Sequence, residues 1–236
     1  DGVDIEVYKG ETLGIVGESG CGKSTLVNLI PRLYDATEGS ITLDGENIKN
    51  ISMKELRDEL GYVPQKGILF SGTIESNIKF GAPEASMDIV KEAAEIAQAT
   101  EFIETKSAKY ESPIAQGGTN VSGGQKQRLS IARDDKYESS ISQGGSNVSG
   151  GQKQRLAIAR AIAKKPKIFI FDDSFSALDL KTDAALRKAL ASKVTDSTVI
   201  IVAQRISTIL HADQILVMDE GKIVGKGTHE ELLKNC

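Results

Sequence analysis

The chain has 236 residues, enough to bury one large hydrophobic core or two small ones. Its 29 basic and 33 acidic side chains give a formal net charge of −4, which argues against a protein that wraps nucleic acid or lies on an anionic membrane. The apolar runs are far shorter than the roughly 18 to 20 residues that span a bilayer, and the sequence shows no charged and apolar leader, so a cytoplasmic location is expected.

The first quarter of the sequence alternates short apolar runs with amphipathic stretches, which predicts strands alternating with helices. Pro64 is expected to end the last of these strands. The expected strands are residues 4–7, 12–16, 41–43 and 61–63, and the expected helices are residues 23–33 and 52–60.

A glycine-rich loop joins the second expected strand to the first expected helix, and it fits the pattern G-x-x-x-x-G-K-[ST] in full. The glycines allow successive backbone N–H groups to face a phosphate, Lys23 can reach phosphate oxygens, and the Ser24 hydroxyl is suited to magnesium. A tight strand-to-helix turn is the simpler alternative, but it leaves the Lys-Ser pair unexplained. The expected nucleotide-binding residues here are Gly17, Glu18, Ser19, Gly20, Cys21, Gly22, Lys23, Ser24 and Thr25.

Helical patterns dominate from residue 67 to about residue 136, notably over residues 86–100 with Ser86 as the expected N-cap. This stretch is interpreted as an inserted helical lobe. Strand patterns then return, separated by an expected helix over residues 180–194, and together they predict a parallel α/β core. The later expected strands are residues 168–172, 198–202, 215–218 and 222–224.

Asp172 follows four apolar residues and stands at the carboxyl end of its expected strand. Ligands of open α/β sheets bind at these ends. Alone this is weak evidence, but beside the glycine-rich loop it predicts a carboxylate in a magnesium shell, bound directly or through water.

The octapeptide Val-Ser-Gly-Gly-Gln-Lys-Gln-Arg occurs twice, 27 residues apart, and residues 110–133 match residues 137–160 at 20 of 24 positions. The junction lies near Asp134. We interpret the repeat as two related sequences joined out of register, by recombination, engineering or an assembly error; a deliberately doubled recognition element is the alternative.

A Ser-Gly-Gly-Gln run at the start of a helix lets backbone amides approach an anion at the positive helix end. Ser149 precedes Asp172 by 23 residues, enough for one helix and a turn, whereas Ser122 precedes it by 50. The second copy is therefore expected in the native place. Its expected ligand-binding residues are Ser149, Gly150, Gly151 and Gln152.

With these motifs in this order, the chain resembles the nucleotide-binding domains of ABC transporters. Gln65 in Tyr-Val-Pro-Gln resembles the Q-loop, residues 176–179 resemble the D-loop, and residues 69–78 are similar to the exporter subfamily that moves drugs, lipids or peptides.

The resemblance implies an α/β fold: a P-loop NTPase RecA-like core with an antiparallel β subdomain and an inserted α-helical signature subdomain. One ABC domain would cover residues 1–236. Residues 1–66 and 161–236 would form the core, and residues 67–160 the helical subdomain, in which residues 110–136 duplicate residues 137–163.

The resemblance also implies ATP and Mg²⁺ as ligands, with the metal near Ser24, Gln65 and Asp172. The expected partners are a second nucleotide-binding domain, paired head to tail as a homo- or heterodimer, and the transmembrane domain of an exporter, on the inner face of the membrane. No nucleic-acid partner is expected.

The chain departs from the family pattern at two of the three expected catalytic residues, which are Asp173, Gln204 and Gln65. Asp173 stands where the family usually has the glutamate that polarises the attacking water. Gln204 stands where a histidine normally contacts the γ-phosphate, and an amide cannot become cationic. A degenerate, slowly hydrolysing ATPase site is expected; tolerated variation with normal turnover is the alternative.

Two other function classes compete with this interpretation. A P-loop kinase would need an acceptor site and leaves the signature unexplained. A soluble ABC-family ATPase acting on nucleic acid or ribosomes is the better alternative, but the sequence shows neither a long heptad run nor a second glycine-rich loop.

Overall fold

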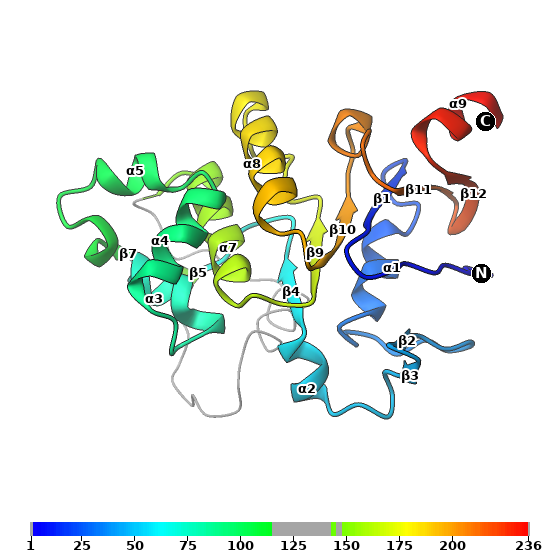
Figure 1. Ribbon diagram of the computed structural model, residues 1–236, viewed down its shortest axis with the longest axis horizontal. Helices are drawn as coiled ribbons and strands as arrows, with labels where there is room; N and C mark the ends of the chain where they lie inside the picture. The colour runs from blue at the N-terminus through cyan, green and yellow to red at the C-terminus, as the bar shows by residue number, and fades with distance from the viewer. Residues whose placement is uncertain (1, 115–142, 145–147, 236) are drawn as a thin grey trace. The chain divides into compact units, whose positions relative to one another are not determined.

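The structure, a computed structural model, describes residues 2–114, 143–144 and 148–235 (Figure 1). The chain divides into two compact units. Unit 1 comprises Asp1–Tyr62, Pro166–Ser176 and Asp196–Cys236, and unit 2 comprises Val63–Lys165 and Ala177–Thr195. In the part of the chain that the structure describes, no helix has both the length and the apolar character needed to cross a membrane.

A six-stranded sheet with the order β12-β11-β1-β10-β9-β4 forms the centre of unit 1. Strands β11, β1, β10 and β9 are parallel to one another, and β12 is antiparallel to β11 at one edge. The strands are β1 (Thr12–Gly17), β4 (Leu60–Val63), β9 (Ile168–Asp172), β10 (Thr198–Val202), β11 (Gln214–Asp219) and β12 (Lys222–Gly227).

Helix α1 (Lys23–Leu29) packs beside β1 and β9. Ile15, Val27, Ile170 and Leu216 belong to one buried cluster, and each is at most 1 % exposed. Both faces of the parallel strands are apolar, as expected for a sheet that is covered on two sides. This core fixes the carboxyl ends of β1 and β9, where the expected site residues begin.

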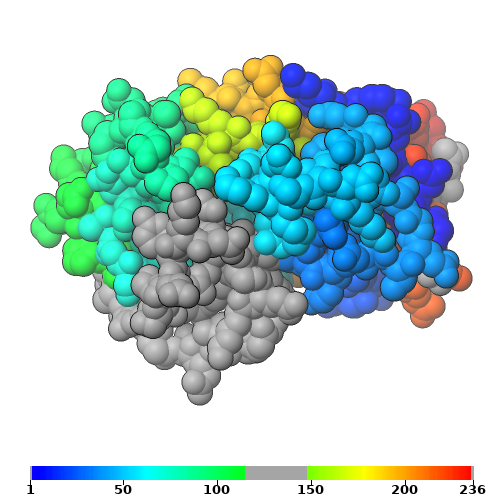
Figure 2. All heavy atoms as spheres, turned by 90° about the horizontal axis from the view of Figure 1, so that it is seen from below, coloured from blue at the N-terminus to red at the C-terminus, as the bar shows by residue number. Residues whose placement is uncertain are grey.

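A second small cluster in unit 1 joins a hairpin to a helix. Asp44 and Gly45 both have positive φ, which allows the two-residue turn between β2 (Thr42–Leu43) and β3 (Glu46–Asn47). Helix α2 (Met53–Asp58) begins at a reciprocal cap between Ser52 and Glu55. Figure 2 shows this blue-to-cyan segment on one continuous face. Unit 1 also contains η3 (Ile206–Thr208) and α9 (His229–Asn235).

Unit 2 is mostly helical, and its two longest helices, α7 and α8, both pack against α4 (Figure 1). The helices in its described residues are α3 (Ile74–Ile78), η1 (Lys79–Gly81), α4 (Met87–Ile96), α5 (Thr100–Glu104), η2 (Lys109–Glu111), α7 (Gly150–Ala163) and α8 (Leu180–Lys193). The described residues also form short antiparallel pairs: β5 (Leu69–Phe70) with β8 (Gln143–Gly144), and β6 (Gly72–Thr73) with β7 (Pro113–Ile114).

The expected parallel α/β core is confirmed, as are the strand over residues 198–202 and the Ser86 cap. The expected strand at residues 4–7 is wrong: Ile5 and Val7 pack against the core of unit 1, and no described strand pairs with them. The expected helix over residues 23–33 ends earlier, at Leu29.

Two further differences concern unit 2. The stretch expected to lack strands contains the short pairs described above, which are too brief for an alternating pattern to reveal. Helix α8 packs on α4 and groups with unit 2, while the expected division of the chain into core and helical subdomain stays a prediction.

Candidate functional site

The glycine-rich loop lies between β1 and α1 and depends on glycine at several positions. Gly17, Gly20 and Gly22 have φ values of +156°, +87° and +100°, a region that other residues rarely adopt. A β-carbon on Gly17 would lie 2.1 Å from the carbonyl oxygen of Met218, so no other residue fits there. The sequence pattern therefore reflects a real steric requirement in this loop.

Lys23 folds back over this loop. Its Nζ donates hydrogen bonds to the carbonyl oxygens of Gly17 at 2.7 Å and Glu18 at 2.6 Å, and the residue is only 9 % exposed. The partners are backbone carbonyls that a phosphate oxygen can replace, because an anion is the stronger acceptor for an ammonium group. Glu18, Ser19 and Gly20 are exposed, so the arrangement places a cation beside an exposed stretch of the loop.

The side chains of Ser24 and Asp172 contact each other in unit 1. Ser24 Oγ donates a hydrogen bond of 2.7 Å to Asp172 Oδ1, and Tyr62 Oη lies 3.0 Å from Asp172 Oδ2. Within the described ranges there is no cluster of three or more His, Cys, Asp or Glu side chains suited to a metal ion. A hydroxyl and one carboxylate do fit Mg²⁺, which binds few protein oxygens and completes its shell with phosphates and water.

Asp173 follows Asp172 in an unusual backbone conformation, with φ at +49°. Its N–H donates to Val202 O at 3.0 Å, and its carbonyl accepts from Ser176 Oγ at 2.8 Å, so both sides of the residue are held. Left-handed conformations at non-glycine residues are strained and occur often at functional sites. The strand end thus directs a buried carboxylate into a defined position.

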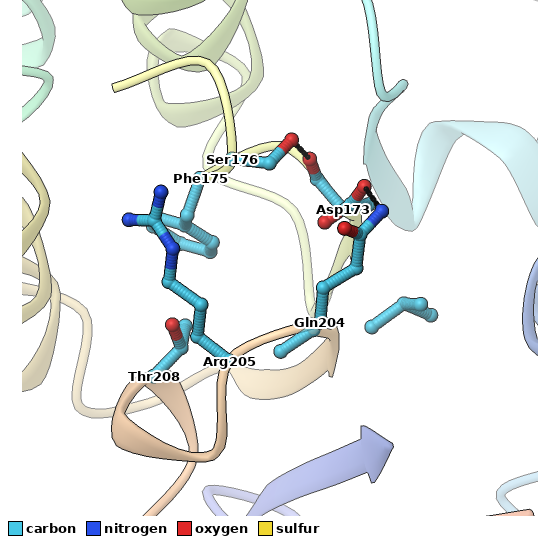
Figure 3. A pocket seen from close by; sticks show the side chains of 8 residues that line it. Asp173, Phe175, Ser176, Gln204, Arg205 and Thr208 are labelled. Atoms are coloured by element: carbon cyan, nitrogen blue, oxygen red, sulfur yellow. Dashed lines mark hydrogen bonds between the residues drawn. The ribbon is translucent and has the colours of Figure 1, made fainter. Parts of the chain in front are cut away.

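Gln204, two residues after the end of β10, contacts this carboxylate directly. Its Nε2 donates a hydrogen bond of 2.6 Å to Asp173 Oδ2 (Figure 3). The pair lies in a pocket of about 180 Å³, on the other side of which Arg205 extends towards Phe175 (Figure 3). The pocket is lined by Asp173, Phe175, Ser176, Val202, Ala203, Gln204, Arg205 and Thr208.

The second signature copy begins α7 in unit 2. Ser149 is the N-cap: its Oγ accepts from Gln152 N at 3.2 Å, and Gln152 Oε1 accepts from Ser149 N at 3.0 Å. A β-carbon on Gly150 would meet nothing within 4 Å, so packing inside this chain does not require glycine there. The first copy, residues 121–128, lies outside the described residues.

Sequence reasoning missed Gln154, which lies on the same helix and is 1 % exposed. Its Nε2 donates to Pro64 O at 2.9 Å, and its Oε1 accepts from Gly67 N at 2.5 Å. It therefore holds both sides of the segment that contains Gln65, whose side chain is exposed. A β-carbon on Gly67 would lie 2.6 Å from Lys153 O, so this segment approaches α7 closely.

Arg160 was missed as well. It donates to Asn77 O, Asn77 Oδ1 and Ile68 O at 2.7 to 3.0 Å, and its guanidinium lies 4.9 Å from the ring centroid of Phe70. Burial lowers the pKa of Arg160 to about 10. This buried cation ties the end of α7 to the segment from residue 68 to residue 77.

Asp179 is the last residue of the segment that resembles the D-loop, and in unit 2 it caps a helix. Its Oδ1 accepts from Thr182 N at 2.9 Å and its Oδ2 from Thr182 Oγ1 at 2.8 Å, which caps α8. These bonds, led by the backbone N–H of Thr182, hold the pKa of Asp179 below its usual value.

The structure brings several of the expected residues together within unit 1: Gly17, Lys23, Ser24, Asp172, Asp173 and Gln204. Gln65 and the second signature copy lie in unit 2.

A family model described as ABC transporter matches residues 1–134 and 133–176. The chain belongs to the ABC transporter family. The two matches meet at residues 133 and 134, where the repeated segments were expected to join.

The relatives agree with this assignment. The chain is 43% identical over 231 residues to a multidrug export ATP-binding/permease protein of Staphylococcus aureus strain NCTC 8325 / PS 47, covering 98% of this chain and 35% of that protein. The corresponding protein of the bovine strain RF122 / ET3-1 is 42% identical over the same length and coverage. The ABC chain thus spans about a third of the length of these relatives.

Among solved structures, that of a bacterial Atm1-family ABC exporter with ATP bound aligns with a TM-score of 0.83 and 35% identity. The alignment covers 98% of this chain and 36% of that one. The predictions of an ABC transporter ATP-binding domain, its fold class and its membership of an ATPase family are confirmed by these matches.

Proposed function

We propose that this chain binds Mg-ATP in the loop of residues 17–25 and serves as the ATP-driven domain of an ABC exporter. One observation supports this most strongly: Ser24 Oγ lies 2.7 Å from Asp172 Oδ1, and Ser24 directly follows the buried Lys23. Lys23 thereby provides a cation for the phosphates. Ser24, the next residue, and Asp172, at the end of its strand, each provide an oxygen for a metal.

Ser24 and Asp172 would hold the magnesium ion, and Gln65 is proposed as a further ligand on the sequence resemblance. When bound, Mg²⁺ neutralises charge on the phosphates and orients them. Lys23 would leave the carbonyls of Gly17 and Glu18 for phosphate oxygens. The backbone N–H groups of residues 20–25 would bind the remaining phosphate oxygens, as the glycine conformations allow.

Asp173 is proposed as the base that orients the attacking water and takes its proton. Aspartate reaches about 1.5 Å less far than glutamate, one C–C bond, and a positioned base contributes about 10² to 10⁴ in rate. Gln204 already donates to the Asp173 carboxylate and, as a neutral amide, cannot transfer a proton. We therefore propose slow hydrolysis and prolonged occupancy by ATP.

The signature residues Ser149, Gly150, Gly151 and Gln152 are proposed to act on a nucleotide held by a second ABC domain, paired head to tail. Gly150 and Ser149 are exposed, and the open space at Gly150 leaves room for a phosphate. The partner domain can be a second copy or a different chain that carries the glutamate and histidine. A transmembrane exporter domain, placing this chain at the cytoplasmic face, completes the proposed assembly; its relatives are named export ATP-binding/permease proteins.

Calorimetry with Mg-ATP tests the proposal on the chain as it stands. The wild-type chain should bind, and Lys23→Ala should weaken binding at least 10-fold, because the phosphates lose a buried cation. Lys222→Ala removes an exposed lysine of unit 1 and should bind as wild type does. Equal affinity of wild type and Lys23→Ala, or no binding by the wild type, would refute the proposed site.

A further inference from the structure

We propose that Tyr62 is a positioning residue for the metal-binding carboxylate of Asp172. The inference rests on the proposed function, because Asp172 is there taken as a magnesium ligand. Tyr62 is the first residue of the Tyr-Val-Pro-Gln segment that contains Gln65, but the sequence assigns it no role, and only the structure places its hydroxyl beside Asp172.

The two oxygens of the Asp172 carboxylate have different partners. Oδ1 accepts from Ser24 Oγ at 2.7 Å, on the side of the glycine-rich loop, and Oδ2 lies 3.0 Å from Tyr62 Oη. Asp172 is 1 % exposed, so water does not readily replace either partner. Two bonds at opposite oxygens fix the plane of the carboxylate and keep Oδ1 directed at Ser24.

Asn28 lies on α1, and its Oδ1 is 2.9 Å from Tyr62 Oη, so the hydroxyl has a second acceptor within reach. A hydroxyl has one proton to donate, and a carboxylate is a stronger acceptor than an amide oxygen. The phenol proton therefore goes to Asp172 and not to Oδ1 of Asn28, a residue that is 6 % exposed. The phenol thus lies between two acceptors, and the carboxylate is the stronger one.

The sheet explains why this contact is rigid. Tyr62 is the third residue of β4, and Asp172 is the last residue of β9, the neighbouring strand in the sheet. Phe169 and Ile170 of β9 are buried, and so are Leu60 and Gly61 of β4, so neither strand can shift without disturbing the core. The phenol thus reaches the carboxylate from a fixed support.

Loss of the hydroxyl would leave Oδ2 buried without this donor, and the carboxylate would be free to turn away from Ser24. Outer partners of metal ligands commonly change metal affinity by about 10- to 100-fold. Tyr62→Phe keeps the ring and its packing, so it removes only the hydrogen bond. The expected effect is a roughly 10-fold weaker response to Mg²⁺.

The test is a Mg²⁺ titration with trinitrophenyl-ATP, a fluorescent ATP analogue, on the full chain. Wild type, Tyr62→Phe and the control Tyr110→Phe are compared, first in excess EDTA and then at increasing Mg²⁺. Tyr110 is a buried tyrosine of unit 2 and controls for the loss of a buried hydroxyl in general. Thermal melting of each variant shows that it is folded.

We expect equal analogue affinity of all three proteins in EDTA, with a Mg²⁺ midpoint about 10-fold higher for Tyr62→Phe alone. An unchanged midpoint would overturn the inference and leave the proposed function intact. Weaker binding of Tyr62→Phe in EDTA as well would also overturn it, because the hydroxyl would then support the fold and not the metal site. If the wild type binds no analogue under any condition, the proposed function itself fails.

Discussion

The side-chain amide of Gln204 donates a hydrogen bond of 2.6 Å to the carboxylate of Asp173, the residue that follows the candidate magnesium ligand. The contact joins the ends of β10 and β9 within unit 1. Both residues differ from the usual family pair of histidine and glutamate, and here the two unusual residues contact each other. They are therefore expected to act as a pair.

The double variant Asp173→Glu, Gln204→His should hydrolyse ATP faster than the wild type, by about 10²-fold, because a base of ordinary reach and a titratable partner are both restored. Phosphate release at saturating Mg-ATP and equal protein concentrations measures this. Each single variant should gain less than the pair, since the two side chains touch. Equal rates for wild type and the double variant would contradict the degenerate site.

Gln154 should stabilise unit 2 through the segment from Pro64 to Gly67. Gln154→Leu leaves a partly buried carbonyl and a partly buried N–H without this partner, and about 1 to 3 kcal/mol for each unsatisfied group is the upper limit of the cost. Urea unfolding should show this loss. Lys153→Gln changes the adjacent, less buried residue and should change the free energy of unfolding by less than about 0.5 kcal/mol; an equal loss in both variants would assign the effect to the helix and not to the contact.

Lysine should not be able to replace Arg160 without a loss of stability. Its three donor nitrogens reach Asn77 and Ile68 at once, and its plane lies over Phe70, a geometry that one ammonium group cannot reproduce. Arg160→Lys is expected to destabilise the chain by about 3 kcal/mol, because hydrogen bonds to a charged group contribute about 1.5 to 3 kcal/mol each. Thermal melting checks this.

Arg187→Lys is the matched control for Arg160→Lys. Arg187 is partly exposed and pairs with Asp183 one helical turn away, a contact that lysine can keep. A melting temperature equal to that of the wild type is expected. If Arg160→Lys also melts with the wild type, the buried contacts of Arg160 contribute little to stability.

The loop of residues 17–25 and the carboxylate of Asp172 could be predicted from sequence because local chemistry determines them. Gly17 and Gly22 adopt backbone conformations that few other residues tolerate, and an apolar run ending in Asp gives a central strand with a carboxylate at its end. Each of these features lies within about ten consecutive residues, so the spacing of residue types is enough to predict it.

Tyr62, Gln154 and Arg160 could not be predicted in the same way. Tyr62 contacts a residue 110 positions away, Gln154 contacts residues 87 and 90 positions away, and Arg160 contacts residues 83 and 92 positions away. Tyr62 and Gln154 lie inside sequence motifs that do not show what their side chains contact, and Arg160 looks like an ordinary helix residue. Their roles depend on which distant segment packs against them, and a single sequence does not state this.

The two copies of the repeated segment contribute different elements to the described structure. Tyr110 and Ile114 of the first copy are buried, and β7 pairs with β6; from the second copy come β8 and the whole of α7. Because the copies are offset by 27 residues, removal of residues 116–142 joins Ala115 to Gln143 in register. Each described helix and strand is retained.

We expect this shortened chain to melt within a few degrees of the full chain and to bind Mg-ATP with the same affinity, because every described element is retained and halving the length of a connection costs or gains only about 0.6 kcal/mol of closure free energy. Removal of residues 110–136 is the matched control: it gives the same length but places serine at the positions of Pro113 and Ala115. Calorimetry and melting compare the three proteins. Loss of Mg-ATP binding in both shortened chains would show that the nucleotide site needs the first signature copy, whereas loss in only one would trace the effect to the residues around Pro113.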